Sequence, residues 1–277
     1  MGREAILRAT WALSLLFLCG GAALAEEARQ STSGPKPGPG VVCPPLSNSK
    51  SAVVITGVSP YLWRHGCGPT AVGMVVGYWD GVGFDDLIPG PAATQTDAVN
   101  QAIASGGNHT YLRAGGGEGH YEDYASPEDS YPDLQEDGIW QMGRPPHPDN
   151  CLADFMQTSR SDARNFYGWS WSSDIIPAFN SYVLLQSPCY APAVGQYYYG
   201  STLTFDVVKQ EIDAGRPMVF LVDSDGNGGT DHFVTVIGYN DGPPQTYIYY
   251  DTWNLKEHET EFHGLAGPPV NDPWGVW

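Results

Sequence analysis

The sequence predicts an α+β domain in which a buried helix comes early in the chain and an antiparallel β-sheet follows. The apolar run from Pro69 to Trp79 indicates the helix, because small and large apolar residues continue for about three turns and proline suits a first helical position. Three β-branched and aromatic runs, at 218–222, 233–239 and 247–250, indicate the strands. Since the helix and the strands occupy separate parts of the chain, we expect an α+β plan.

The N-terminal 25 residues have the layout of a secretory signal peptide. Arg3 and Arg8 precede an apolar stretch from Trp11 to Leu18, and Ala23-Leu24-Ala25 precedes Glu26. The apolar stretch is too short to span a bilayer. We therefore expect cleavage after Ala25, no membrane association of the product, and a secreted or periplasmic location.

The remainder divides into a linker and one domain. Residues 31–40 are rich in Ser, Pro and Gly, so residues 26–50 are expected to form a flexible linker before a domain at 51–277.

Residues 80–150 are rich in Gly, Pro, Asp and Tyr, which predicts a long loop insertion around a functional cleft. Shorter elements are expected at 51–55, as a strand, and at 97–104, 152–158, 175–185 and 205–214, as helices.

The chain is strongly acidic, with a formal net charge of −18. The leader holds two arginines and one glutamate, so its removal leaves a charge of −19. Nucleic acids and anionic membranes are approached through basic patches, so the charge argues against both as partners. The hydrophobic content of 42% is enough to fill a core, which excludes a disordered chain.

Four cysteines remain after the leader: Cys43, Cys67, Cys151 and Cys189. An even number in an oxidising compartment favours two disulfides. If Cys67 is instead a nucleophile, one pair and one further thiol remain. Cys151 with Cys189 is then the preferred pair because Cys43 lies beside the linker, although sequence does not determine the connectivity.

Cys67 directly precedes the predicted buried helix. A thiol attacks carbonyl groups as a thiolate, and the unpaired N–H groups and dipole at a helix N-terminus favour that charge. Gly66 and Gly68 on either side would leave room for a substrate backbone. The alternative is a buried or disulfide-bonded cysteine at a helix start.

A histidine and a carboxylate are placed to act with this thiol. If Tyr239 faces Thr246 across the turn between two strands, Asp251 faces Val234, and His232 lies diagonally across on the same face of the sheet. Diagonal neighbours lie about 7 to 8 Å apart at the backbone. The Asp251 carboxylate could therefore orient the His232 imidazole.

These three groups suit an acyl-transfer reaction at an amide. His232 would take the proton of Cys67 and later give a proton to the leaving amine, while Asp251 fixes the imidazole tautomer. Ordinary surface or structural roles are expected for the other histidines: His65, His109, His120, His147, His258 and His263.

Three segments, 65–71, 231–239 and 249–251, resemble the motifs of papain-like cysteine peptidases. They are most similar to bacterial relatives of the double-glycine leader peptidases that process bacteriocin precursors. The resemblance, over about residues 50–80 and 205–255, implies a papain-like fold and a triad of Cys67, His232 and Asp251. It also implies a peptide or protein substrate and no required cofactor.

One position departs from this pattern. Such enzymes usually carry a glutamine six residues before the nucleophile as an oxyanion donor, and Tyr61 stands here. Its hydroxyl could donate instead, as could Trp63 or His65. The departure keeps two alternatives to a hydrolase open, a catalytically silent binding domain and an acyl transferase.

The segment from Asp223 to Gly228 has the start of a calcium loop, with Asp223, Asp225 and Asn227 as its ligands. Its twelfth position is Val234, where such a loop needs a glutamate. A polar turn between two strands is therefore favoured over a calcium site, and no metal is expected.

Overall fold

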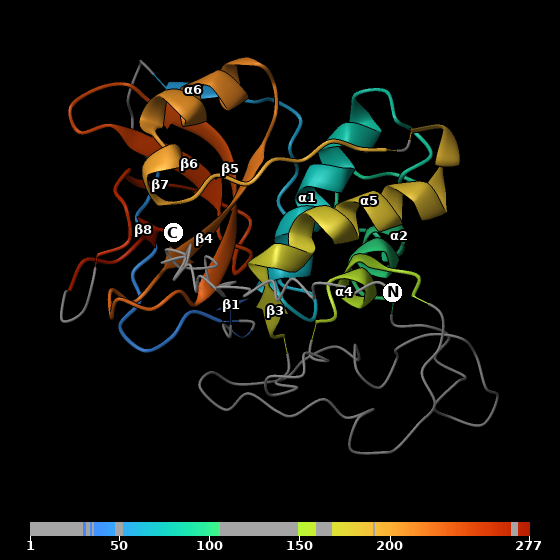
Figure 1. The fold of residues 1–277 in the computed structure, drawn as a ribbon, viewed down its shortest axis with the longest axis horizontal. Helices are drawn as coiled ribbons and strands as arrows, with labels where there is room; N and C mark the ends of the chain where they lie inside the picture. Colours follow the sequence, from blue (N-terminus) through green and yellow to red (C-terminus); the bar gives the residue numbers. More distant parts are fainter. Residues whose placement is uncertain are drawn as a thin grey trace, which may run out of the picture.

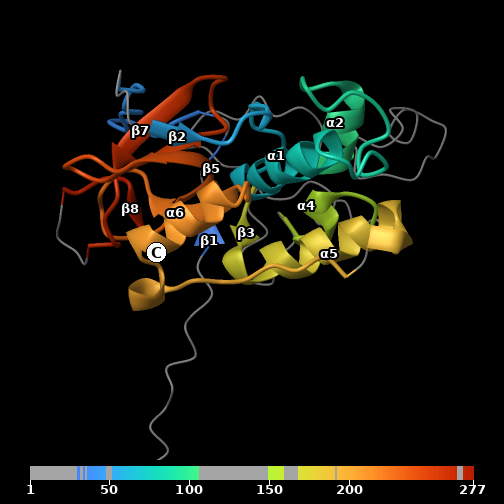
Figure 2. The same cartoon turned by 90° about the horizontal axis from the view of Figure 1, so that it is seen from above.

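The computed structural model has a helical half and a sheet half packed side by side, which is the α+β class expected (Figures 1 and 2). It describes residues 30–31, 34, 36–47, 52–105, 149–158, 168–190, 192–266 and 271–277. The expected signal peptide and most of the expected loop insertion lie outside these residues.

Helix α1 (Cys67–Gly81) is the centre of the helical half, and twelve of its 15 residues are buried. Helices α2 (Asp97–Ile103), α4 (Leu152–Phe155) and α5 (Ile175–Gln186) pack around it. Because neighbours cover α1 on several sides, its sequence is apolar all round. Helix α6 (Phe205–Asp213) packs against the sheet instead, and its single buried stripe makes it amphipathic.

Six antiparallel strands form the sheet, with β7-β6-β5-β4-β8 in order and β2 also paired with β5. Strand β5 (His232–Asn240) is buried along its whole length because both α1 and α6 pack against it. The other strands of this sheet are β2 (Ala52–Val54), β4 (Met218–Asp223), β6 (Thr246–Tyr250), β7 (Glu257–Glu261) and β8 (Gly275–Val276). Strands β1 (Gln30–Ser31) and β3 (Ser170–Trp171) form a separate antiparallel pair.

The expected elements are present with small changes at their ends. Helix α1 begins two residues earlier than its apolar run predicts, so Cys67 stands inside the first turn. Strand β7 was not predicted, because Glu-His-Glu-Thr-Glu has no apolar residue. Its His258 and Glu259 are nevertheless buried, each held by hydrogen bonds.

Residues 41–47 pack on the sheet half, which corrects the expectation of a flexible linker for this part of the chain. Trp274 Nε1 donates to the carbonyl of Val42, and His258 Nδ1 lies 2.9 Å from the carbonyl oxygen of Pro44. Ser47 donates to the Glu259 carboxylate from its backbone N–H over 2.9 Å. The folded unit therefore begins before residue 51.

None of Cys43, Cys67, Cys151 and Cys189 forms a disulfide, so the preferred pair of Cys151 with Cys189 is not made. Cys151 is buried at the start of α4, whereas Cys189 is exposed. Within the described part of the chain, no helix is both long and apolar enough to cross a membrane.

Candidate active site

Tight packing fixes the turn that leads into α1. Gly66 has a φ of +150°, a conformation that side chains rarely adopt, and a Cβ there would lie 2.9 Å from Pro69 Cδ. A Cβ on Gly68 would lie 2.9 Å from Met156 Cε and 3.2 Å from Ser170 Cβ. Both glycines are therefore required by the packing of the protein itself, which corrects the expectation that they leave room for a substrate.

Hydrogen bonds hold the same turn in place. Thr70 Oγ1 accepts from the Arg64 N–H over 2.9 Å and donates to the Gly66 carbonyl over 2.7 Å. The N–H of Trp63 donates to the Thr252 carbonyl over 2.6 Å. Since Thr252 follows Asp251, this bond ties the segment before α1 to the sheet side of the site.

Cys67 is fully buried in the first turn of α1. Its Sγ accepts the backbone N–H of Phe233 over 3.5 Å. A donor to sulfur and the position at a helix N-terminus both favour the thiolate. Phe233 directly follows His232, so this bond joins the cysteine motif to the histidine motif. Four side chains surround the thiol in an apolar cluster: Trp63, Ala71, Leu221 and Phe233.

His232 begins β5 and is also fully buried. Its Nε2 lies 2.6 Å from the backbone oxygen of Asp251, and its ring stacks on Trp253 with the centroids 3.8 Å apart. A carbonyl oxygen only accepts, so Nε2 carries the proton and Nδ1 is left as the base. Burial, opposed by the contacts with Asp251, lowers the pKa of His232 to about 4.

A β-bulge determines how Asp251 meets His232. At the turn, Asn240 faces Thr246 and Tyr239 faces Tyr247, one residue away from the expected register. The irregularity between Val236 and Gly238 then shifts the pairing, so Thr235 faces Tyr250. The register at the site end is therefore the one that the sequence predicts, although the register at the turn is not.

The Asp251 carboxylate is held by donors other than the His232 imidazole. It accepts from Trp253 N over 2.9 Å, from Asn254 N over 3.0 Å and from Asn254 Nδ2 over 2.7 Å. His258 Nε2 lies 3.0 Å from its Oδ2. The hydrogen bond from His232 goes to the Asp251 backbone oxygen, which corrects the expected contact with the carboxylate. The carboxylate acts on His232 through its charge.

His258 contacts Asp251, although no sequence pattern points to it as a site residue. Burial alone would lower its pKa, but the hydrogen bond and charge of Asp251 and the Pro44 carbonyl outweigh burial and raise it. For Asp251, burial alone would raise the pKa, and the hydrogen bond and charge of His258 lower it. The two residues therefore form a buried pair in which each side chain favours the charged state of the other.

Cys43 approaches the same carboxylate from the N-terminal segment. Burial first, and then the charge and hydrogen bond of Asp251, raise the pKa of Cys43 to about 12. Its thiol therefore stays protonated at neutral pH. Burial likewise raises the pKa of Cys151 well above its ordinary value. Neither thiol competes with Cys67 as a nucleophile.

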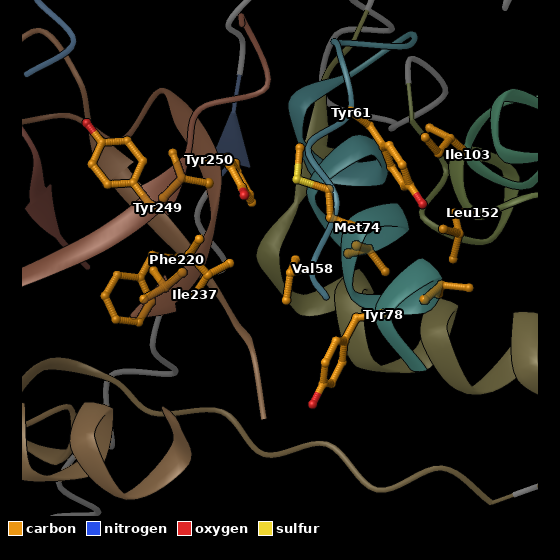
Figure 3. Packing of buried hydrophobic residues seen from close by; sticks show 14 of the residues in the cluster. Val58, Tyr61, Met74, Tyr78, Ile103, Leu152, Phe220, Ile237, Tyr249 and Tyr250 are labelled. Carbon is orange, nitrogen blue, oxygen red and sulfur yellow. The ribbon is translucent and has the colours of Figure 1, made fainter. Parts of the chain in front are cut away.

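Tyr61 does not reach the site, so its expected role as oxyanion donor is wrong. Its hydroxyl donates to the Ala92 carbonyl over 2.5 Å and lies against Gly77. Gly77 is ten residues along α1 from Cys67, a distance of about 15 Å at 1.5 Å per residue. Figure 3 shows the Tyr61 ring near Ile103, on the side of α1 away from the sheet.

The segment from Asp223 to Gly228 is the turn between β4 and β5. The Asp223 carboxylate accepts the N–H groups of Gly226, Asn227 and Gly228, so its oxygens hold the turn together. Asp225 accepts from Asn227 Nδ2 over 2.9 Å. Among the residues that the structure describes, no cluster of three His, Cys, Asp or Glu side chains could hold a metal ion.

Two of the remaining histidines, His65 and His263, are among the described residues. His65 is buried next to Trp63, and His263 lies 3.6 Å from Asp272 Oδ2. His109, His120 and His147 lie outside the described residues.

Residues 146–265 match the Peptidase_C39 like family. The match supports assignment of the chain to the papain-like cysteine peptidase superfamily and indicates a cysteine peptidase-like function. The matched region contains His232 and Asp251. Because it begins at residue 146, residues 146–205 also have a counterpart in this family, which the sequence motifs alone do not reveal. No curated protein and no solved structure matches the chain.

Proposed function

We propose that the chain is an exported cysteine peptidase or amide-bond hydrolase, with Cys67 as nucleophile and His232 as general base. The contact of Phe233 N–H with Cys67 Sγ carries this proposal, because it brings two motifs 166 residues apart to one point. Asp251 holds the imidazole through its backbone oxygen and adds negative charge behind it.

The chemistry follows from these positions. Nδ1 of His232 takes the thiol proton, and Sγ of Cys67 forms a bond to the carbonyl carbon of the substrate. The imidazolium gives its proton to the leaving amine as the C–N bond breaks, which leaves an acyl-enzyme. Water, deprotonated by the same nitrogen, then releases the acid. The first two N–H groups of α1, those of Cys67 and Gly68, are suited to stabilise the oxyanion, because a helix does not use its first N–H groups internally.

An apolar cavity of about 500 Å³ lies next to this site, between α1, α5 and β4. Leu221 and Phe233 line it and also surround the Cys67 thiol. We therefore expect a preference for substrates with a large apolar side chain near the scissile bond. A random peptide library, analysed by mass spectrometry after incubation, would measure this preference.

One observation favours a second function, a papain-like binding domain without turnover. Both Cys67 and His232 are fully buried, so a substrate cannot reach them in this conformation. Hydrolysis assays on the peptide library separate the two functions, with Cys67→Ser and His232→Gln as matched controls. Cleavage that both substitutions abolish supports the hydrolase, and binding without cleavage supports the binding domain.

The same assay separates a hydrolase from an acyl transferase. Hydroxylamine added to the reaction would divert the acyl-enzyme to a hydroxamate in either case. A peptide amine added in its place would be incorporated efficiently only by a transferase. Export is tested separately, by N-terminal sequencing of the protein recovered outside the cytoplasm, which should begin at Glu26.

A further inference from the structure

His258 lies next to Asp251, and both nitrogens of its ring face oxygen atoms. Nδ1 lies 2.9 Å from the carbonyl oxygen of Pro44, and Nε2 lies 3.0 Å from Oδ2 of Asp251 and 3.2 Å from Oδ1 of Asn254. The orientation of the Asn254 amide is fixed, because its Oδ1 accepts the N–H of Lys256 over 2.8 Å. Its Nδ2, which lies 2.9 Å from the same ring nitrogen, donates to Asp251 Oδ2 over 2.7 Å. Since carbonyl oxygens and an ionised carboxylate only accept, both ring nitrogens carry a proton, and His258 is an imidazolium.

The positive charge of His258 is enclosed by the protein. Its side chain belongs to a residue only 5% exposed, and its ring packs against Tyr249 of β6 with the centroids 5.6 Å apart. Burial alone would lower the pKa of His258, but Asp251 outweighs burial and raises it. Lys256 is a nearby positive charge that opposes this rise. Raised pKa values keep the surrounding Cys43 thiol and Tyr249 hydroxyl neutral at neutral pH, so neither replaces the imidazolium as partner of the carboxylate.

The Asp251 carboxylate that His258 contacts also holds together the turn at residues 251–254. It accepts the N–H groups of the two residues after Thr252, over 2.9 and 3.0 Å. Thr252 itself is fully buried and has a φ of +64°, a left-handed conformation that a β-branched residue rarely adopts. Such a conformation persists only where the surrounding contacts enforce it. The carboxylate, fixed by His258, supplies those contacts.

This turn makes two contacts that orient the His232 imidazole. The backbone oxygen of Asp251 lies 2.6 Å from Nε2, and the Trp253 ring stacks on the imidazole with the planes 8° apart. The turn also reaches the other side of the site. The carbonyl of the residue after Asp251 accepts the N–H of Trp63, which packs in the apolar cluster around the Cys67 thiol. A change in the turn would therefore move the imidazole relative to the thiol.

We infer that His258 is a positioning residue of the active site: as a buried imidazolium it holds the Asp251 carboxylate and so fixes the turn that orients the general base His232. The inference rests on the proposed function, because it names what positions the base of that same site. It differs from the triad that the sequence motifs imply. There the carboxylate would orient the imidazole directly, whereas here the carboxylate holds the turn and a backbone oxygen orients the imidazole.

Deprotonation of His258 should release the turn. Nε2 would then direct a lone pair toward two oxygen atoms, and the buried carboxylate would lose its positive partner. Because the pKa of His258 is raised, the contact is fully present below pH 6.5 and is lost as the pH rises through that pKa. Burial lowers the pKa of His232 to about 4, so His232 does not itself titrate in this range.

Nuclear magnetic resonance of the full mature protein, with ¹⁵N in its histidine rings, reads the protonation of each ring nitrogen. Single His→Gln variants assign the signals, by elimination for any variant that does not fold. At pH 6 both nitrogens of His258 should be protonated and His232 should carry its proton on Nε2. As the pH rises, the His232 signals should shift with the midpoint of the His258 titration. A neutral His258 at pH 6, or His232 signals that do not follow its titration, would overturn the inference.

Iodoacetamide alkylation of Cys67 at pH 6 measures the consequence for catalysis, with the exposed Cys189 as the reference thiol. His258→Gln keeps a hydrogen-bond donor but removes the charge. It should slow labelling of Cys67 at least tenfold, because displacement of a catalytic group by about 1 Å can cost about 100-fold in rate. His263→Gln is the matched control, since His263 also lies near an aspartate, 3.6 Å from Asp272 Oδ2, and it should leave the rate unchanged.

The outcomes separate this inference from the proposed function. Labelling of Cys67 that His232→Ala slows, but that His258→Gln leaves unchanged, would overturn the positioning role and leave the proposed function intact. Labelling that neither substitution changes would overturn both.

Discussion

The burial of His232 predicts a specific loss of stability in acid. Burial lowers the pKa of His232 from 6.5 to about 4, so between these values the unfolded chain binds a proton that the folded protein does not. Stability therefore falls as the pH falls through this window. Each unit of pKa difference corresponds to about 1.4 kcal/mol. The shift of the His232 pKa should therefore lower the free energy of unfolding by about 3 kcal/mol between pH 7 and pH 4.

Substitution His232→Gln isolates this contribution. Glutamine can still donate to the Asp251 carbonyl but does not titrate, and both proteins keep the titrations of His258 and Asp251. Urea unfolding, followed by tryptophan fluorescence at several pH values from 7 to 4, gives the two stability profiles. The wild-type profile should fall about 3 kcal/mol further than that of the variant. Parallel profiles would mean that His232 is not buried as a neutral imidazole, and the reasoning would fail.

Three further substitutions test the surroundings of the site. His258→Gln should cost about 2 kcal/mol in urea unfolding, because it leaves the buried Asp251 carboxylate without its ion-pair partner, and a change below 0.5 kcal/mol would contradict the pairing. Tyr61→Phe should cost about 1 kcal/mol in stability for the lost hydrogen bond and leave Cys67 alkylation unchanged. Gly68→Ala should cost about 1 to 3 kcal/mol by thermal or urea unfolding, because its Cβ would lie 2.9 Å from Met156; a neutral effect would show that the turn is looser than described.

The sequence predicts the elements that carry Cys67 and His232 well, because local periodicity determines those elements. Apolar continuity places Cys67 at a helix start, and alternation along a strand places His232 and Val234 on one face. The pairing of β5 with β6 at the site depends on a non-local feature, the bulge after Val236. At the turn the pairing differs from the expected one by one residue, and the bulge restores the expected pairing at the site. No sequence pattern in the chain indicates that bulge.

Other parts of the site depend on contacts between distant segments. Counting six residues back from Cys67 selects Tyr61, but its ring packs on the opposite side of α1, where the small Gly77 leaves space for the hydroxyl. His258 lies on a strand without apolar residues, so periodicity does not detect it. The N-terminal segment reads as a linker by composition, yet His258 and Trp274 bind its carbonyl groups.

The central claim is that Cys67 and His232 form an activated thiol–imidazole pair, and the pH dependence of Cys67 alkylation tests it most directly. The measurement uses the full mature protein, with Cys67→Ala and His232→Ala as controls and the exposed Cys189 as the reference thiol. Rapid labelling of Cys67 that persists below pH 7, and that His232→Ala slows at least tenfold, is the expected result. Labelling of Cys67 that falls steadily below pH 7, in wild type and His232→Ala alike, would contradict the claim.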